Sequence, residues 1–427
     1  MGGTVDTQRY DVLVVGAGPA GSVAALCLAR GGARVALLDK ASFPRDKACG
    51  DLVGPRGVRL LEDLGVELPE SRQVGDMEVS GPTGRRVSLP CREGSSYPGH
   101  GVAVTRLVFD DVLRRAAVGA GAEPRTGRAG EPIFEGEGLA GFVTSAGEEL
   151  RADVVLGADG ATSHVASVAG LVDPARSLWG FALRSYVEAD VEVPLIAWWE
   201  TEPWKAFAGY GWAFPGPGPL ANVGLGMALL GDRRKGALPV RLMARIAGDA
   251  PSLGGWLKMG MAGTEAARGR VLLLGDAAGL VNPLQGEGIA PAMWSGRAAA
   301  EAVLAGPSGA AGRYREALDA RFGAYYPAAA AIQAVLVGRP RAAALVERVL
   351  TTGVVGACLA GSWALFWNDL VDGAPHGGAR NVAVVAGAAG LALSRTSRLR
   401  ALSRPHGIRM YSRRPRPPAP PSPPRER

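Results

Sequence analysis

Residues 10–21, YDVLVVGAGPAG, form the most informative stretch of this sequence. Tyr10–Val15 is a short run of mostly apolar and β-branched residues, which predicts a buried strand. Ser22–Arg30 follows with the spacing of apolar residues expected for a helix. Residues 33–38, ARVALL, predict a second buried strand that ends at Asp39. Strand, glycine turn, helix and strand together predict the start of a dinucleotide-binding fold, whereas a bare glycine turn is the alternative.

The glycines between the first strand and the helix match GxGxxG. Gly16 permits the tight turn, Gly18 lets a pyrophosphate approach the backbone, and Gly21 lets the helix pack closely on the strand. The N-terminus of the helix offers unpaired N–H groups to phosphates. Asp39 lies where a carboxylate holds ribose hydroxyls and disfavours a 2′-phosphate, so FAD or NAD is expected rather than NADP. The residues predicted to contact the cofactor here are Gly16, Gly18, Ala20, Gly21 and Asp39.

Two later segments repeat the pattern of a buried strand followed by glycine and aspartate. Residues 153–156 precede GADG, which contains Asp159, and residues 270–274 precede GDAAGLVNPLQGEGI, which contains Asp276. A helix is predicted from Ala290 to Leu304. We expect Asp276 to accept a ribityl hydroxyl, and the amides of Gly288 and Ile289 to face the carbonyl side of a flavin ring.

GAGPAG, GADG and GDAAGLVNPLQGEGI, in this order, resemble the flavoprotein superfamily of p-hydroxybenzoate hydroxylase type over about residues 8–305. Two further segments are similar to its geranylgeranyl reductases. FPRDKACG at 43–50 resembles their PRxKxCG segment, and GYGWAFP at 209–215 resembles their YxWxFP signature. The position after GDAA is Gly279, where monooxygenases of the superfamily usually have His. The resemblance implies an FAD cofactor and an α/β fold: a Rossmann-like FAD-binding fold, an antiparallel-sheet substrate domain of α+β type and a helical C-terminal region.

The resemblance also implies roles for single residues. Cys49 and Gly50 are expected beside the flavin ring, and Cys49 is a candidate for proton delivery, although a small buried hydrophobe would give the same pattern. Arg106 is expected against the FAD pyrophosphate, and its alternative is an ordinary surface arginine. Asp159 is expected to be a turn carboxylate near FAD. Arg45 and Lys47 are candidates for steering an anionic head group or an electron donor, with a solvated face as the alternative.

Tyr210, Trp212 and Phe214 alternate along one predicted strand and therefore share a face. They are predicted to line an apolar substrate channel, with Tyr210 a candidate acid, and ordinary core packing is the equal alternative. Trp198 and Trp199 must point to opposite faces, so both cannot line one channel. The four histidines and four cysteines show no metal-ligand spacing, and no metal site is predicted.

The predicted domains are discontinuous. Residues 1–74, 101–175 and 262–308 are assigned to the FAD-binding domain, and residues 75–100 and 176–261 to a substrate-binding β-sheet domain. Residues 309–404 are assigned to a C-terminal helical region and residues 405–427, with eight prolines, to a disordered Pro/Arg tail. The apolar runs 349–367 and 382–393 are read as a buried helical pair, with a membrane-dipping element or a span as alternatives.

The net charge of +7 lies almost entirely at the C-terminus. Residues 395–427 hold ten arginines and one acid, so the body of the chain is weakly acidic. This distribution argues against nucleic acid as a partner and favours, at most, an anionic membrane surface. With no signal-peptide pattern at the N-terminus, a cytoplasmic protein is expected, with peripheral contact to the inner face of the membrane as the further reading.

The function that follows from the resemblance is FAD-dependent reduction of C=C bonds in a prenyl chain carried by a lipid, isoprenoid quinone or terpenoid. Only one dinucleotide fingerprint is present, so NAD(P)H or a carrier such as ferredoxin is expected as a transient electron donor. The alternative enzyme is an FAD-dependent monooxygenase or halogenase. The alternative from another class is a flavin- or lipid-binding protein without turnover.

Overall fold

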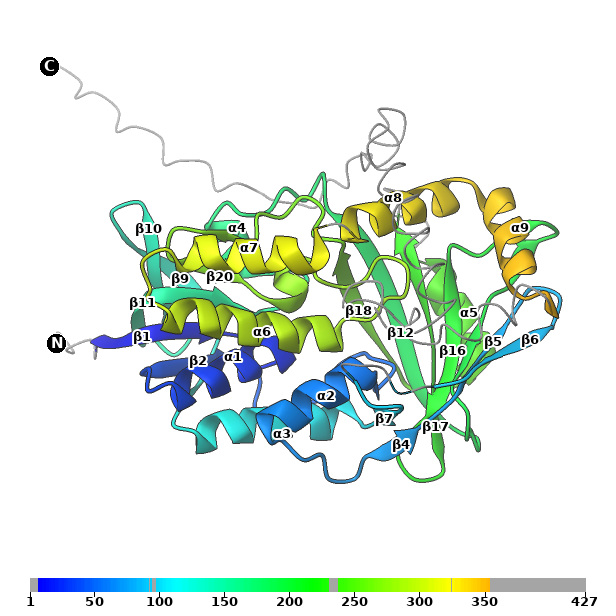
Figure 1. The fold of residues 1–427 in the computed structure, drawn as a ribbon, viewed down its shortest axis with the longest axis horizontal. Coiled ribbons are helices and arrows are strands. Elements are labelled where there is room, and N and C mark those ends of the chain that lie inside the picture. Colours follow the sequence, from blue (N-terminus) through cyan, green and yellow to red (C-terminus); the bar gives the residue numbers. More distant parts are fainter. Residues whose placement is uncertain (1–6, 92, 94–96, 230–236, 324, 354–427) are drawn as a thin grey trace, which may run out of the picture.

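The computed structural model describes residues 7–91, 93, 97–229, 237–323 and 325–353, and two large sheets organise them (Figure 1). The first is a predominantly parallel sheet of eight strands in the order β19-β20-β11-β1-β2-β8, with a β9–β10 hairpin attached to β11. Its strands are β1 (Thr7–Val15), β2 (Val35–Asp39), β8 (Glu123–Thr126), β9 (Ala129–Glu135), β10 (Gly138–Thr144), β11 (Glu149–Gly157), β19 (Ala267–Arg268) and β20 (Val271–Leu273).

The register of this sheet brings three distant motifs to one edge. Val15 at the end of β1 pairs with Gly157 at the end of β11. Gly157 in turn pairs with Leu273 at the end of β20. The turns that follow these three parallel strands are GAGPAG, GADG and GDAAG. They therefore meet at the carboxyl edge of the sheet, where open α/β sheets bind their ligands.

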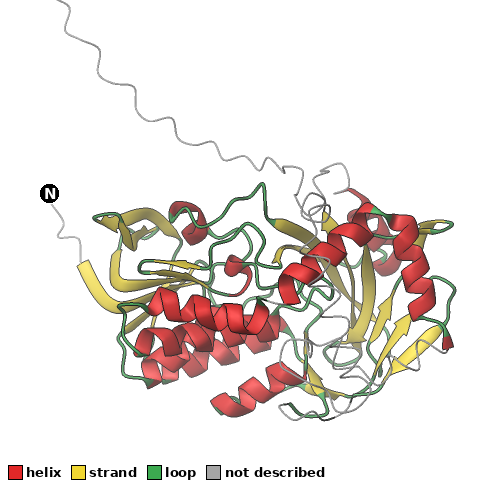
Figure 2. Ribbon diagram, turned by 45° about the horizontal axis from the view of Figure 1, so that its top comes forward, coloured by secondary structure: helices red, strands yellow, loops and turns green. Residues whose placement is uncertain are grey.

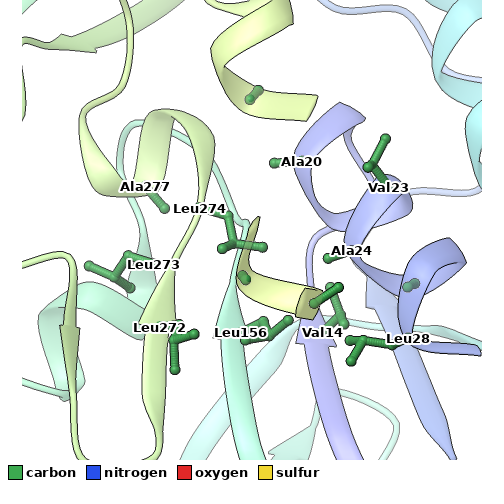
Figure 3. Packing of buried hydrophobic residues seen from close by; sticks show 14 of the residues in the cluster. Val14, Ala20, Val23, Ala24, Leu28, Leu156, Leu272, Leu273, Leu274 and Ala277 are labelled. Atoms are coloured by element: carbon green, nitrogen blue, oxygen red, sulfur yellow. The ribbon is translucent and has the colours of Figure 1, made fainter. Parts of the chain in front are cut away.

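The helices that pack directly on this sheet are α1 (Pro19–Arg30), α4 (His164–Val168) and α7 (Ala310–Phe322). Helices α3 (Arg106–Gly119) and α6 (Ile289–Leu304) pack on α1, and α2 (Pro55–Leu64) packs on α6. Figure 3 shows Val23, Ala24 and Leu28 of α1 beside Val14 and Leu156 of the sheet. Helices α1 and α6 approach so closely that a Cβ at Gly296 would lie 2.2 Å from the Ala20 carbonyl oxygen. Only glycine fits there, so two segments some 270 residues apart in sequence form one packed layer.

The second large sheet has seven strands in the order β18-β12-β17-β16-β13-β5-β6, and all neighbouring pairs are antiparallel except β13–β5. Figure 2 shows its strands beside the helical layer of the first sheet. Its strands are β5 (Met77–Ser80), β6 (Arg86–Leu89), β12 (Leu178–Glu188), β13 (Leu195–Ala197), β16 (Gly209–Pro215), β17 (Leu220–Leu229) and β18 (Ser252–Met259).

The remaining elements connect or cover the two sheets. A three-stranded sheet joins β3 (Leu52–Val53), β7 (Gly101–Ala103) and β4 (Arg72–Val74), and β14 (Glu200–Glu202) pairs with β15 (Lys205–Ala206). Helix α5 (Ala237–Ala247) packs on β12 and β17, α9 (Pro340–Leu350) packs on β15, and α8 (Tyr325–Gly338) leads into α9.

The expected fold class is confirmed, since a Rossmann-like sheet and a mainly antiparallel sheet both form. The strands expected in residues 75–100 are β5 and β6, which join the sheet formed by the later segments. The hairpin of β9 and β10 was not among the expected elements. The apolar run 349–367 extends past residue 353, and the run 382–393 and the tail 405–427 lie wholly outside the described residues.

Helix length and composition were compared with what a membrane crossing requires. No single described helix is long and apolar enough to cross a membrane. Helices α8 and α9 are long and apolar enough only when taken together, and the chain bends by 111° between them.

Candidate functional site

A cavity of about 610 Å³ lies between the two sheets. At one end it is lined by Pro19 at the start of α1, by the loop 47–50 and by residues 286–289 at the start of α6. Elsewhere its walls come from β5, β6, β12, β16, β17 and β18 of the second sheet and from α8 and α9, and they are mostly apolar. The cavity therefore joins the edge that carries the glycine motifs to a long apolar chamber.

The start of α1 has the features of a pyrophosphate cradle. Its N-cap residue is Gly18, which has no side chain that could cap the helix, and Pro19 follows in the first turn. A Cβ built at Gly18 would lie 3.6 Å from Nη2 of Arg45, so a cation already faces this backbone. Asp39 accepts the Ala17 amide at 2.7 Å and the Ala41 amide at 2.8 Å, which holds its carboxylate at the end of β2. These residues fit the ADP half of FAD.

The start of α6 supplies a second set of open amides. Ala290 donates its N–H to Glu287 Oε1 at 2.9 Å, and Pro291 has no N–H. Gly288 and Ile289 line the cavity beside Asp276. Backbone amides at a helix start, with a carboxylate next to them, suit a flavin carbonyl and a ribityl hydroxyl.

Lys258 of β18 is hydrogen-bonded to the GDAAG turn, which forms the short 3-10 helix η2 (Gly275–Ala278). Its side chain is 1% exposed, and Nζ donates to the Ala277 carbonyl oxygen at 2.5 Å. Burial lowers the pKa of Lys258 to about 8, although the charges of Asp159 and Asp276 act in the opposite direction. The sequence analysis missed this lysine, because an alternating strand pattern does not reveal which polar residue turns inward.

Cys49 lies against Arg106 at the flavin end of the cavity, and both residues line it. Burial raises the pKa of the Cys49 thiol, while Arg106 and the Asp51 amide favour the thiolate. Arg106 is buried and bonds Asp110 through two nitrogens, both at 2.7 Å. Arg45 Nη1 lies 2.8 Å from Asp110 Oδ2, the same oxygen that accepts from Arg106 Nη2. Arg106 thus faces Cys49, whereas Arg45 is the arginine beside Gly18, and the expected contact of Arg106 with the pyrophosphate stays a prediction.

Asn222 of β17 links the loop that carries Cys49 and Asp51 to Trp212 of β16. Its position along the chain gave no signal of this role. Its side chain is fully buried, and Nδ2 donates to the Cys49 carbonyl at 2.9 Å and to Asp51 Oδ2 at 2.8 Å. Its Oδ1 accepts the Trp212 indole N–H at 2.9 Å. Tyr186 donates to the same Asp51 carboxylate. Burial raises the pKa of Asp51, and its hydrogen bonds to Tyr186 and Asn222 oppose that shift.

The alternating aromatics of β16 share the cavity face, as their spacing predicts. Tyr210, Trp212 and Phe214 all line the cavity, and Trp212 stacks on Phe214 with ring centroids 6.2 Å apart. The Tyr210 hydroxyl donates to the Gln285 carbonyl, and burial raises its pKa. Because its proton is already engaged, Tyr210 has the position of a wall residue more than that of an acid. Of the paired tryptophans, Trp198 lines the cavity. Trp199 does not line it, and stacks on Phe207, which does.

Asp159, the aspartate expected near FAD, is not among the residues that line the cavity. Its carboxylate accepts from the Ser163 hydroxyl at 2.5 Å, the His164 amide at 2.6 Å and the Val165 amide at 3.1 Å. It therefore caps the N-terminus of α4. The described part of the chain contains no group of three His, Cys, Asp or Glu side chains that could hold a metal ion.

Comparison with known proteins places this site in a family. The family model described as "FAD binding domain" matches residues 9–181. A menaquinone reductase of Mycolicibacterium smegmatis is 34% identical over 70% of this chain and 77% of its own length. A geranylgeranyl diphosphate reductase of Rhodobacter capsulatus is 36% identical over 70% of this chain and 76% of its own length. A digeranylgeranylglycerophospholipid reductase of Methanopyrus kandleri is 33% identical over 69% and 76%.

Solved structures support the fold. A geranylgeranyl bacteriochlorophyll reductase-like protein of Thermoplasma acidophilum aligns with a TM-score of 0.66 and 22% identity, over 93% of this chain and 99% of the other. A flavin-dependent brominase aligns with a TM-score of 0.63 and 20% identity, over 86% and 99%, so at this level the fold is shared across reactions. By its sequence relatives, the chain belongs to the geranylgeranyl reductase family of FAD-dependent oxidoreductases, and its cofactor is FAD.

Proposed function

We propose that this protein reduces carbon–carbon double bonds in the prenyl chain of an apolar substrate held in the cavity. The observation that carries the proposal is the continuity of the cavity, which runs from the amides of α1 and α6 into an apolar chamber of about 610 Å³. When bound, reduced FAD supplies a hydride equivalent. One alkene carbon then receives hydride and the other receives a proton, so no leaving group is needed.

The chain's own residues position the alkene, exclude water from it and supply the proton. An isolated alkene is weakly polarised, so it must be held close to the reducing centre in a site without water. Trp212 and Phe214 form an apolar wall beside Gly50, where a Cβ would lie 2.9 Å from the Phe214 ring. Cys49 carries a thiol whose raised pKa keeps its proton at neutral pH. We infer that Cys49 delivers the proton and that Arg106 fixes the orientation of its sulfur.

The site contacts to FAD are part of the same proposal. Gly16, Gly18, Ala20 and Gly21 with Asp39 hold the ADP half, and Arg45 reaches the pyrophosphate. Asp276, Gly288 and Ile289 with Gly50 hold the flavin half. Electrons arrive from NAD(P)H or a carrier such as ferredoxin that visits transiently, because only the GxGxxG at residues 16–21 stands between a strand and a helix. The second match, at residues 136–141, falls at the turn between β9 and β10.

Anaerobic turnover tests the proposal against its alternatives. Purified FAD-loaded enzyme, reduced with dithionite, is mixed without oxygen with a prenylated quinone, a prenyl diphosphate and a prenylated glycerolipid. Mass spectrometry should detect a gain of about two mass units for each reduced bond in at least one substrate. Product formed only when oxygen is admitted would identify a monooxygenase or halogenase instead. Retention of FAD with no oxidation of the reduced enzyme by any acceptor would identify a binding protein.

Peripheral membrane contact is a further part of the proposal. Helix α9 leaves Leu345 54% and Val349 42% exposed, and the arginine-rich segment 395–427 follows in sequence. An exposed apolar helix face and nearby basic residues are the two features that favour an anionic bilayer surface. Such contact would bring the cavity close to the lipids in which prenylated substrates dissolve.

A further inference from the structure

Glu347 is a carboxyl group in an otherwise apolar part of the cavity. It lies on α9 and lines the same cavity as Cys49. The other lining residues that α8 and α9 contribute are nearly all apolar: Ile332, Leu336, Val337, Pro340, Ala343, Val346 and Leu350, with Gln333 as the exception. Gln333 donates its amide to Met259 Sδ and to the Pro283 carbonyl. Glu347 is therefore the carboxyl group at this end of the chamber.

The Glu347 carboxyl has no partner among the described residues. Its Oε2 is buried and accepts no hydrogen bond. The adjacent Arg348 points elsewhere and bonds both oxygens of Glu200, at 2.7 and 2.9 Å. Thr351 bonds only the backbone carbonyl of Glu347, at 2.8 Å. A buried polar group without a partner is destabilising, so its retention in a cavity points to a ligand that completes it.

The protonation state of Glu347 defines what that ligand can be. Burial, and then the charge of Glu200, raise the pKa of Glu347 to about 8. At neutral pH the group is a carboxylic acid with one O–H donor. A donor of this kind matches an uncharged oxygen acceptor.

The distribution of charge along the cavity excludes an anionic head group at this end. Lys47 and Arg106 are the cations among the described lining residues, and both lie at the flavin end. Arg106 is bonded to Asp110, and Lys47 lies 3.8 Å from Asp276. Among the described lining residues, a diphosphate placed beside Glu347 would meet no unpaired cation, and it would lose its hydration, which is strongly unfavourable.

We propose that Glu347 forms a head-group subsite in which its O–H donates to a neutral carbonyl oxygen of the substrate, a quinone carbonyl being the matching group. This subsite selects a prenylated quinone over a prenyl diphosphate. The inference rests on the proposed function, because it assumes that a prenyl chain occupies the cavity.

Binding measurements on the FAD-loaded enzyme test the subsite. The probes are a prenylated quinone and a prenyl diphosphate of the same chain length, and the variants are Glu347→Leu and Glu347→Gln. Losing one buried hydrogen bond should raise the Kd of the quinone roughly 10-fold in Glu347→Leu. Glu347→Gln keeps an N–H donor and should stay within about 3-fold of wild type. Glu316→Gln, at an exposed position of α7, is the matched control.

A pH series on the unmutated enzyme gives an independent reading. Quinone affinity should fall as pH rises through about 8, because Glu347 then loses the proton it donates. The same series with Glu347→Gln should be flat in that range. Equal quinone affinity in Glu347→Leu and wild type, or a wild-type preference for the diphosphate, overturns the subsite while leaving prenyl reduction intact. If the wild type neither binds nor reduces any prenyl chain, the proposed function and the subsite fall together.

Discussion

Asn222 joins two parts of the site, the loop that carries Cys49 and the aromatic face of β16. One side-chain amide bonds the Cys49 carbonyl, the Asp51 carboxylate and the Trp212 indole. Cys49 and Asn222 are 173 residues apart in sequence, and β17 and the cysteine loop meet only in the folded chain. Asn222 therefore sets the distance between the proposed proton donor and the wall that holds the substrate.

Leucine has the same branched shape and the same number of side-chain heavy atoms as asparagine but forms no hydrogen bonds. Replacing Asn222 by leucine should therefore show whether its hydrogen bonds position Cys49. The variant leaves the Trp212 N–H and the Cys49 carbonyl unpaired, at a cost of about 1–3 kcal/mol in unfolding free energy. We expect kcat to fall at least roughly 10-fold while FAD stays bound, since the thiol loses its fixed position. Gln73→Leu on the exposed side of β4 is the control. An Asn222→Leu enzyme with unchanged kcat would remove Asn222 from the positioning role.

Cys49 leads to a prediction about pH. Burial raises the pKa of its thiol, so the protonated form persists to a higher pH than in an ordinary cysteine, whose pKa is about 8.5. If this proton reaches the alkene, kcat measured under anaerobic conditions should stay level past that value and then decline. Cys49→Ala should be slower and should lack this decline. A wild-type decline that persists unchanged in Cys49→Ala would assign the titration to another group.

At the scale of elements, strand β18 is hydrogen-bonded to the turn η2 through one buried lysine. The bond from Lys258 to the Ala277 carbonyl fixes the turn that carries Asp276. Lys258→Met should weaken FAD binding about 10-fold, because the turn then loses its one buried donor bond from this strand. Fluorescence titration of the apoprotein with FAD measures this effect. The control is Lys205→Met, a lysine of β15 whose side chain is 45% exposed and pairs with Glu202. An unchanged Kd for FAD would show that η2 holds its shape without the lysine.

The elements also show where prediction from sequence succeeds. The β1–α1–β2 unit and the helix after GDAAG were predictable because each depends on local periodicity and glycine geometry. The inward face of β16 was predictable from the alternation of Tyr210, Trp212 and Phe214. The positions of Asn222, Lys258 and Glu347 were not predictable, because the role of each depends on residues that are distant in sequence and adjacent only in the folded chain. A polar residue in an alternating pattern is normally assigned to solvent, and only the packed structure shows these three turned inward.

At the scale of the whole molecule, the charge is divided between a weakly acidic body and the basic segment 395–427. Deleting residues 405–427 removes six arginines and one glutamate. We expect FAD binding to be unchanged and co-sedimentation with anionic vesicles to decrease, since each basic residue near such a surface contributes about 1 kcal/mol. Neutral vesicles serve as the control. Equal sedimentation of the two proteins with anionic vesicles would rule the segment out as the source of attraction.

The order of strands in the first sheet has a consequence for how the protein is made on the ribosome. Strand β20 lies beside β11, and Gly296 of α6 packs on Ala20 of α1, so the first layer to be translated is completed only by segments about 250 to 270 residues later. Contacts between such distant segments form slowly and leave the early strands exposed meanwhile. A nascent chain that stops at residue 181, where the matched FAD-binding segment ends, lacks β20, η2 and α6. In the proposed site η2 and α6 complete the contacts to FAD, so we expect cofactor capture to come late in synthesis.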